Sequence, residues 1–111
     1  MLGCCKEILN IGCFNSCDDL KVDFDFTNHP PVFTITTGNY RIYFKDGTMN
    51  GYFDFVITQD MIDDNLYELP NVFKEDKTIV MQLHKETSTG VYELATNTCY
   101  TLKTIQCNNL S

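Results

Sequence analysis

The chain has 111 residues, of which 43% are hydrophobic, and a formal net charge of −7 at pH 7. A chain of this length suits one domain with one modest core, and its apolar runs are far shorter than the roughly 20 residues that cross a bilayer. The acidity argues against nucleic acid and membranes as partners, because binding to phosphate backbones or anionic lipids needs a cationic surface.

Residues 1–19 are predicted to form a cysteine-rich N-terminal arm, and residues 20–111 the folded domain. Within the arm, Cys5 to Leu9 has the mixed character of one or two helical turns, and Asn15 to Asp19 is polar and turn-like. The hydrophobic pattern changes at Leu20, and this change marks the boundary between arm and domain.

From Leu20 onward, apolar residues recur at every second position, which is typical of strands with one buried and one exposed face. Turns separate these stretches, and the turn dipeptides Asp46-Gly47 and Asn50-Gly51 are expected to bracket the loop of a hairpin. A short acidic loop or helical turn is expected over Gln59 to Leu66. The predicted strands cover residues 20–26, 32–36, 40–45, 52–57, 67–69, 78–84, 91–94 and 100–105.

Seven or eight short strands and no long amphipathic helix indicate an all-β fold. We expect an immunoglobulin-like β-sandwich of about seven strands with a short N-terminal arm, and a jelly roll or an open barrel is the alternative. The chain has no Trp, so the buried Trp of antibody domains is absent.

The six cysteines lie near the two ends of the sequence, at Cys4, Cys5, Cys13, Cys17, Cys99 and Cys107. This clustering predicts that the two ends are close in space. Disulfides could pin the arm to the last strand, for example Cys13 or Cys17 with Cys107. Alternatively, Cys13, Cys17, Cys99 and Cys107 could bind a structural zinc ion, or several cysteines could be reduced and buried. The sequence leaves these alternatives open, because six cysteines allow 15 pairings.

Residues for catalysis are sparse. The histidines, His29 and His84, cannot be placed beside a nucleophile from sequence, and no glycine-rich phosphate loop is present. We therefore predict that the chain is not an enzyme and binds no cofactor. The acidic stretch from Asp60 to Asn65 offers oxygen ligands for Ca²⁺, but its spacing does not match an EF-hand loop, and a solvated acidic loop that caps a turn is the favoured interpretation.

A sugar-binding surface is a further possibility for a small β-sandwich, because exposed aromatic rings stack on sugar rings. The candidate rings are those of Tyr43, Tyr92 and Tyr100, which in strands more often serve as cross-strand packing partners.

The most distinctive stretch is Cys4-Cys5-Lys6-Glu7-Ile8-Leu9-Asn10-Ile11-Gly12-Cys13-Phe14-Asn15-Ser16-Cys17-Asp18. Together with the ending from Tyr100 to Cys107, it resembles small β-sandwich virion proteins of crAss-like and related tailed phages of gut Bacteroidetes. In these, a cysteine-rich arm leads into strands, and a Tyr-rich strand with a late Cys closes the chain. The resemblance covers about thirty residues at the two ends.

This resemblance implies a virion structural protein, either an auxiliary (decoration) protein of the capsid or a small head or fibre component. The implied partners are the major capsid protein or other virion proteins, on a shell assembled in the host cytoplasm and carrying many symmetric copies. A glycan-binding module of a bacterial surface or secreted protein is the alternative function.

Overall fold

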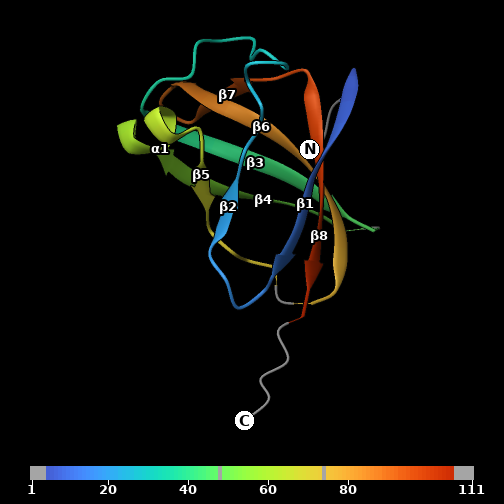
Figure 1. Cartoon of the computed structure of the whole chain (residues 1–111). Coiled ribbons are helices and arrows are strands. Elements are labelled where there is room, and N and C mark those ends of the chain that lie inside the picture. The colour runs from blue at the N-terminus through green and yellow to red at the C-terminus, as the bar shows by residue number, and fades with distance from the viewer. Residues whose placement is uncertain (1–4, 48, 74, 107–111) are drawn as a thin grey trace.

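The computed structural model describes residues 5–47, 49–73 and 75–106, and this part of the chain is mostly β-structure, with 57% of residues in strands and 6% in helix (Figure 1). The all-β prediction is confirmed. In chain order the elements are β1 (Glu7–Asn15), β2 (Leu20–Val22), β3 (Gly38–Asp46), β4 (Met49–Ile57), α1 (Gln59–Asp64), β5 (Tyr67–Leu69), β6 (Lys77–Ser88), β7 (Val91–Leu94) and β8 (Thr98–Ile105). Within the described residues, no helix has the length and apolar character needed to cross a membrane.

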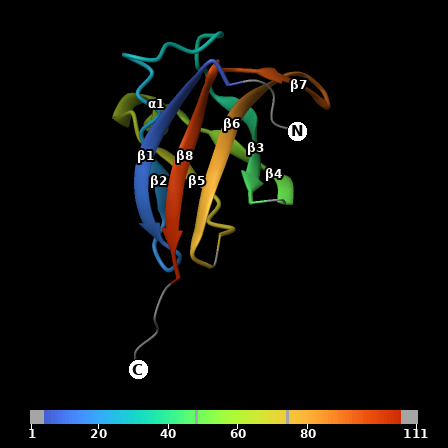
Figure 2. The ribbon, with the colours of Figure 1, turned by 90° about the vertical axis from the view of Figure 1, so that its right-hand side faces the viewer.

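The main sheet has six strands in the order β1-β8-β6-β3-β4, with β7 paired to β6 as well. The long strand β6 pairs with β8 through its first half and with β7 through its second half. β1 pairs with β8 in parallel, whereas the other neighbours are antiparallel. Figure 2 shows β1, β8 and β6 side by side, so the start of the chain and its last strand are neighbours, as the cysteine clustering predicts.

A small second sheet covers one face of the main sheet (Figure 1). It consists of the antiparallel strands β2 and β5, which have three residues each. Their buried side chains meet the inward side chains of the main sheet, and burial of each large apolar side chain contributes roughly 1.5–3 kcal/mol. The largest fully buried residues of this core are Tyr40, Tyr67, Tyr100, Phe24, Leu20, Ile42, Ile57, Ile79, Met81, Leu83 and Leu102.

The immunoglobulin-like sandwich is not confirmed. A sandwich of that kind stacks two sheets of comparable size. Here one sheet has six strands and the other has two very short ones. The strands predicted from about residue 40 onward are nevertheless present, with ends that differ by a few residues.

The N-terminal arm contains a strand, so the helical turns expected from Cys5 to Leu9 are wrong. β1 belongs to the main sheet and follows β8 with a register shift between Asn10 and Cys13. At this bulge Gly12 has a φ of 117°, which favours glycine, and its N–H bonds to the Asn10 side chain at 2.9 Å. The predicted arm over residues 1–19 therefore contributes β1 to the main sheet.

The segment between β2 and β3 is irregular, so two strand predictions need correction. The strand predicted over residues 20–26 ends at Val22, because the chain turns at Asp25, which has a φ of 54° and an N–H bonded to the Asp23 carboxylate. The strand predicted over residues 32–36 is wrong. Its backbone finds a partner outside a strand ladder: the Thr36 N–H donates to the Tyr40 hydroxyl, and the Thr36 carbonyl accepts from the same hydroxyl.

The β3–β4 hairpin positions the candidate site. Its register is unbroken over nine pairs, from Gly38 opposite Ile57 to Asp46 opposite Met49. Gly47 in the loop has a φ of 59°, so the turn predicted at Asp46-Gly47 is confirmed. The turn predicted at Asn50-Gly51 is wrong, because both residues lie in β4 and pair with Lys45 and Phe44. Alternation along β3 buries Tyr40 and Ile42 in the core and places the intervening side chains on the opposite face of the sheet.

Candidate functional site

Arg41 on β3 lies among three tyrosine rings on the face of the main sheet that points away from the core. Its guanidinium carbon is 4.1 Å from the centroid of the Tyr52 ring, 4.1 Å from that of Tyr92 and 5.7 Å from that of Tyr43. The rings come from β4, β7 and β3, so the cluster joins three strands. A guanidinium held over aromatic faces is attracted by the ring quadrupole, by about 0.5–1 kcal/mol at exposed sites. We refer to Arg41, Tyr43, Tyr52, Tyr92 and Asp54 as the Arg41 cluster.

Asp54 fixes the orientation of the guanidinium. Arg41 donates from Nε to Oδ1 of Asp54 at 2.6 Å and from a terminal nitrogen to Oδ2 at 3.2 Å, and a second terminal nitrogen donates to the Tyr43 hydroxyl at 3.3 Å. The hydrogen bonds to Asp54 and then to Tyr43 raise the pKa of Arg41, so the cation is permanent. The Arg41 side chain is 20% exposed and that of Asp54 is 49% exposed, so a partner can reach both.

The register of the hairpin builds this arrangement. Arg41 lies directly opposite Asp54, and Tyr43 lies directly opposite Tyr52. Cross-strand pairs on one face have Cβ atoms about 4.5–5.5 Å apart, which suits both an ion pair and an aromatic pair. Sequence reasoning missed this site, although a hairpin turn at Asp46-Gly47 already implies both pairings.

His84 and Gln82 connect the Arg41 cluster to the centre of the sheet. The His84 ring meets the Tyr43 ring edge-on, with centroids 4.7 Å apart, and its Nε2 lies 3.4 Å from the side-chain oxygen of Gln82. Burial, with a smaller contribution from the Arg41 charge, lowers the pKa of His84. The imidazole is therefore neutral at pH 7 and serves as a packing and hydrogen-bonding group.

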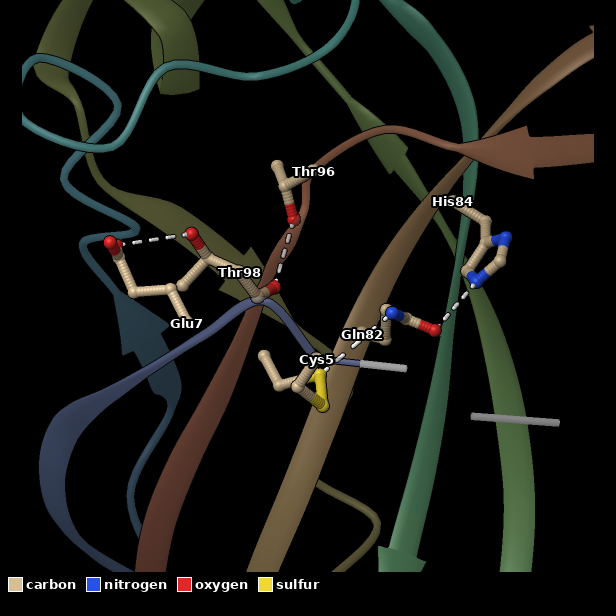
Figure 3. The surroundings of a disulfide bond; sticks show 7 residues. Cys5, Glu7, Gln82, His84, Thr96 and Thr98 are labelled. Atoms are coloured by element: carbon tan, nitrogen blue, oxygen red, sulfur yellow. Dashed lines mark hydrogen bonds between the residues drawn. A yellow bond between two sulfur atoms is a disulfide. The ribbon is translucent and has the colours of Figure 1, made fainter. Parts of the chain in front are cut away.

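A disulfide between Cys5 and Cys99 lies next to Gln82, whose side-chain nitrogen is 3.8 Å from Sγ of Cys99 (Figure 3). The two Cα atoms are 5.4 Å apart, within the usual range for a disulfide. The bond links the residues before β1 to β8, where Thr98 donates to the Glu7 carboxylate. A disulfide thus links the arm to the last strand, as expected, but it joins Cys5 and Cys99 rather than one of the example pairs.

The other cysteines fall into different groups. Cys17 is also disulfide-bonded, and Cys13 is an exposed free thiol, so the suggested pairing of Cys13 with Cys107 is wrong. Cys4 and Cys107 lie outside the described residues. Cys17 and Cys99 are disulfide-bonded in this structure and so do not offer the thiolates that the zinc site of Cys13, Cys17, Cys99 and Cys107 needs. The described ranges contain no group of three or more His, Cys, Asp or Glu side chains that could hold a metal ion.

The remaining candidates lie apart from the Arg41 cluster. The acidic stretch from Asp60 to Asn65 is mostly helix α1, capped by Thr58, whose side chain accepts from the Met61 N–H. His29 contacts the carboxylate of Glu7 and lies 3.9 Å from that of Asp25. Both features have local structural roles that account for them.

Of the three proposed sugar-stacking rings, Tyr100 is fully buried and cannot stack on a sugar. Its burial raises the pKa of the phenol to about 12. The Tyr92 ring has the Arg41 guanidinium on one face, and Tyr43 packs against His84. Tyr52, which was not proposed, is 56% exposed and is the most accessible ring of the Arg41 cluster.

Comparison of the chain with protein-family models, with curated proteins and with solved structures gives no match. A function therefore has to be argued from the chemistry of the surface.

Proposed function

We propose that this chain is an attachment protein that binds other proteins through the Arg41 cluster, and that it serves as an auxiliary structural protein of a phage virion. The observation that carries the binding role is the partly exposed Arg41 cation, held in place by Asp54 between Tyr52 and Tyr92. Tyr and Arg are the residues most enriched among the energetic centres of protein interfaces, together with Trp.

The rigidity of the cluster favours binding. Tyr and Arg side chains normally lose rotamer freedom when a partner immobilises them, at about 0.5–1.5 kcal/mol each. Here the two-point contact with Asp54 and the aromatic stacking already restrict Arg41 before any partner arrives. A surface that is ordered in advance binds with a smaller loss of entropy.

The virion assignment is supported by the resemblance of the two ends of the sequence to phage virion proteins. The net charge of −7 fits a protein that faces solvent and other proteins rather than packaged nucleic acid. The expected partners are the major capsid protein or another virion protein, and the expected location is the virion, in many symmetric copies.

The test is co-sedimentation of the purified chain with shells assembled from the major capsid protein encoded in the same genome. We expect binding at a fixed ratio to the capsid protein, and a loss of at least about 30-fold in affinity for Arg41→Gln, equivalent to about 2 kcal/mol. The matched control is Lys45→Gln, which removes the same charge from an exposed position of β3 outside the cluster.

A chain that binds neither the shells nor any other purified virion protein would overturn the virion assignment. Equal affinities for the Arg41 and Lys45 variants would overturn the role of the cluster. Far-ultraviolet circular dichroism of both variants confirms that the comparison is between folded proteins.

Glycan binding remains the second candidate, because the exposed Tyr52 ring lies beside the polar atoms of Arg41 and Asp54. Sugar-binding sites combine such a ring with charged hydrogen-bonding groups. A glycan array separates the two functions: reproducible binding that disappears in Tyr52→Ala supports this candidate, and an array without signal removes it.

A further inference from the structure

β4 is an open edge of the main sheet, since no other strand pairs with its outer side among the described residues. Along this nine-residue strand, Met49 is 66% exposed and Val56 is 54% exposed. Its one charged residue, Asp54, is paired with Arg41. A long, regular and apolar edge is a template on which another extended chain can form backbone hydrogen bonds.

The opposite edge of the sheet is not equivalent. β1 carries the bulge between Asn10 and Cys13, which interrupts its ladder, and it begins next to the Cys5–Cys99 disulfide. Bulges are among the devices by which proteins prevent unwanted strand pairing. β4 has no bulge, no proline and no lysine, so protection is confined to the β1 edge.

The backbone groups on the open side of β4 can be identified from the register. In a hairpin with a two-residue loop, the pair next to the loop, here Asp46 and Met49, is hydrogen-bonded, and bonded pairs then alternate with non-bonded ones. The even-numbered residues of β4 therefore direct their N–H and C=O groups outward. These residues are Asn50, Tyr52, Asp54 and Val56.

A mostly apolar cavity of about 380 Å³ opens beside the Met49 end of this edge, and its lining also includes the charged residues Asp46, Glu75 and Lys77. Phe44, Phe53 and Phe73 line it, and the rings of Phe44 and Phe73 meet edge-on with centroids 5.0 Å apart. Gly51 contributes to its shape, because a Cβ there would lie 2.7 Å from the Phe44 ring. Strand addition typically combines a backbone ladder with pockets that receive alternate side chains of the added strand.

The other end of β4 is acidic. Helix α1 follows directly, with Asp60, Asp63 and Asp64 exposed and no basic residue in its last turn. Figure 1 shows α1 at the carboxyl end of β4. Since each copy of the chain carries a net charge of −7, a second copy is a poor occupant of this edge, whereas a cationic segment is attracted to it.

We propose that the β4 edge binds an extended segment of a partner protein as an additional strand. The segment places a large apolar side chain in the cavity beside Phe73 and carries Lys or Arg residues at its opposite end, next to α1. The two sites share Tyr52 and Asp54 but use different atoms: the Arg41 cluster uses their side chains, and strand addition uses their outward N–H and C=O groups.

The first experiment selects from a displayed library of random peptides about 12 residues long, enough to span the strand. We expect enriched peptides to alternate apolar and polar residues, with a large apolar residue towards one end and basic residues at the other. Val56→Pro removes an outward N–H at an edge position, where proline is tolerated, and should weaken these peptides by about tenfold or more. The control is Val56→Ala, which shortens the same side chain but keeps the N–H.

The second experiment tests the cavity. Val72→Phe places a larger side chain at its lining without touching the backbone of β4, and should weaken the selected peptides by about tenfold. Val91→Phe makes the same change on β7 at a valine of similar exposure, 49% against 47% for Val72, and should leave their affinity within about twofold.

Failure to enrich any peptide would overturn the proposal, and so would enrichment of acidic peptides or equal binding to the Val56→Pro and Val56→Ala variants. A dimer in sedimentation velocity that Val56→Pro converts to monomer would assign the edge to a second copy and refute the basic partner. Arg41→Gln leaves the outward backbone groups of β4 in place and frees the Asp54 carboxylate, so it should bind the selected basic peptides at least as tightly as the wild type. Failure of the strand-addition site and failure of the Arg41 cluster therefore give different results.

Discussion

The Cys5–Cys99 disulfide gives the most direct test of how the fold is stabilised. Its two residues are separated by 94 positions in the sequence, and closing a loop of about 100 residues in the unfolded chain is worth about 4.7 kcal/mol in the chain-entropy model. Cys17 is also bridged, so the unfolded chain is already constrained and regains less entropy. We therefore expect Cys5→Ala to lower the free energy of unfolding by about 2–4 kcal/mol.

Cys5 is the better residue to replace, because it is exposed whereas Cys99 is fully buried. Truncation of Cys99 would add the loss of packing in the sheet to the loss of the bridge. The measurement is equilibrium unfolding in urea without reductant, followed by far-ultraviolet circular dichroism because the chain has no Trp. Cys13→Ala removes an exposed free thiol and is the control, expected within about 0.5 kcal/mol of the wild type.

Thiol titration of the denatured proteins, again without reductant, checks the premise. If the bridge is present, Cys5→Ala exposes one reactive thiol more than the wild type, that of Cys99; if it is absent, the variant has one fewer. Equal unfolding free energies for Cys5→Ala and Cys13→Ala, with the bridge proved by titration, would refute the argument from loop entropy.

Two further predictions concern side chains near the sheet. The hydroxyl of the buried Tyr40 donates to the Thr36 carbonyl at 2.8 Å and accepts from the Thr36 N–H at 3.1 Å. Tyr40→Phe should therefore lower the free energy of unfolding in urea by about 1–2 kcal/mol. An unchanged midpoint of urea unfolding would show that these hydrogen bonds contribute nothing. Burial lowers the pKa of His84 below its usual 6.5, so the unfolded chain binds this proton more readily and stability falls as the pH drops below 6.5. In thermal unfolding between about pH 7 and pH 5, His84→Gln should therefore lose less stability than the wild type. The control, His29→Gln, should keep the loss of stability that is due to His84. Identical pH profiles for the wild type and His84→Gln would contradict the predicted direction of the effect.

The strands from β3 onward were predictable because local patterns suffice for them. Turns that contain Gly47 and Gly90 end β3 and β6, Pro70 follows β5, and period-two alternation decides which face is buried. In β3, for example, Tyr40 and Ile42 are buried while Arg41 and Tyr43 lie on the other face. Patterns of this kind also fix the hairpin register, which is why the pairing of Arg41 with Asp54 was within reach of sequence reasoning.

β1 could not be predicted from the same signal. Its core-facing residues are Leu9, Ile11 and Phe14, whose spacing changes from two to three across the bulge. A spacing that changes in this way resembles a helix over a short window. Its partner, β8, lies about ninety residues away in the sequence, and no local pattern reveals a parallel pairing at that distance.

The disulfide was unpredictable for the same reason. Cys5 reaches Cys99 only because β1 runs parallel to β8, with Glu7 opposite Thr98. Once that pairing is known, it follows that the bond lies at the start of both strands. Cysteine spacing alone contains no information about it, since the connectivity depends on the pairing of distant strands.

The two edges of the main sheet show how acidity and fold complement each other. The β1 edge is protected by its bulge, whereas β4 keeps an unbroken ladder with exposed Met49 and Val56. An unprotected edge ordinarily invites self-association, because identical chains present identical backbone groups. The net charge of −7 on each copy makes two copies repel each other, whereas it attracts a cationic segment. The acidity of the chain thus leaves β4 open for the proposed partner of opposite charge.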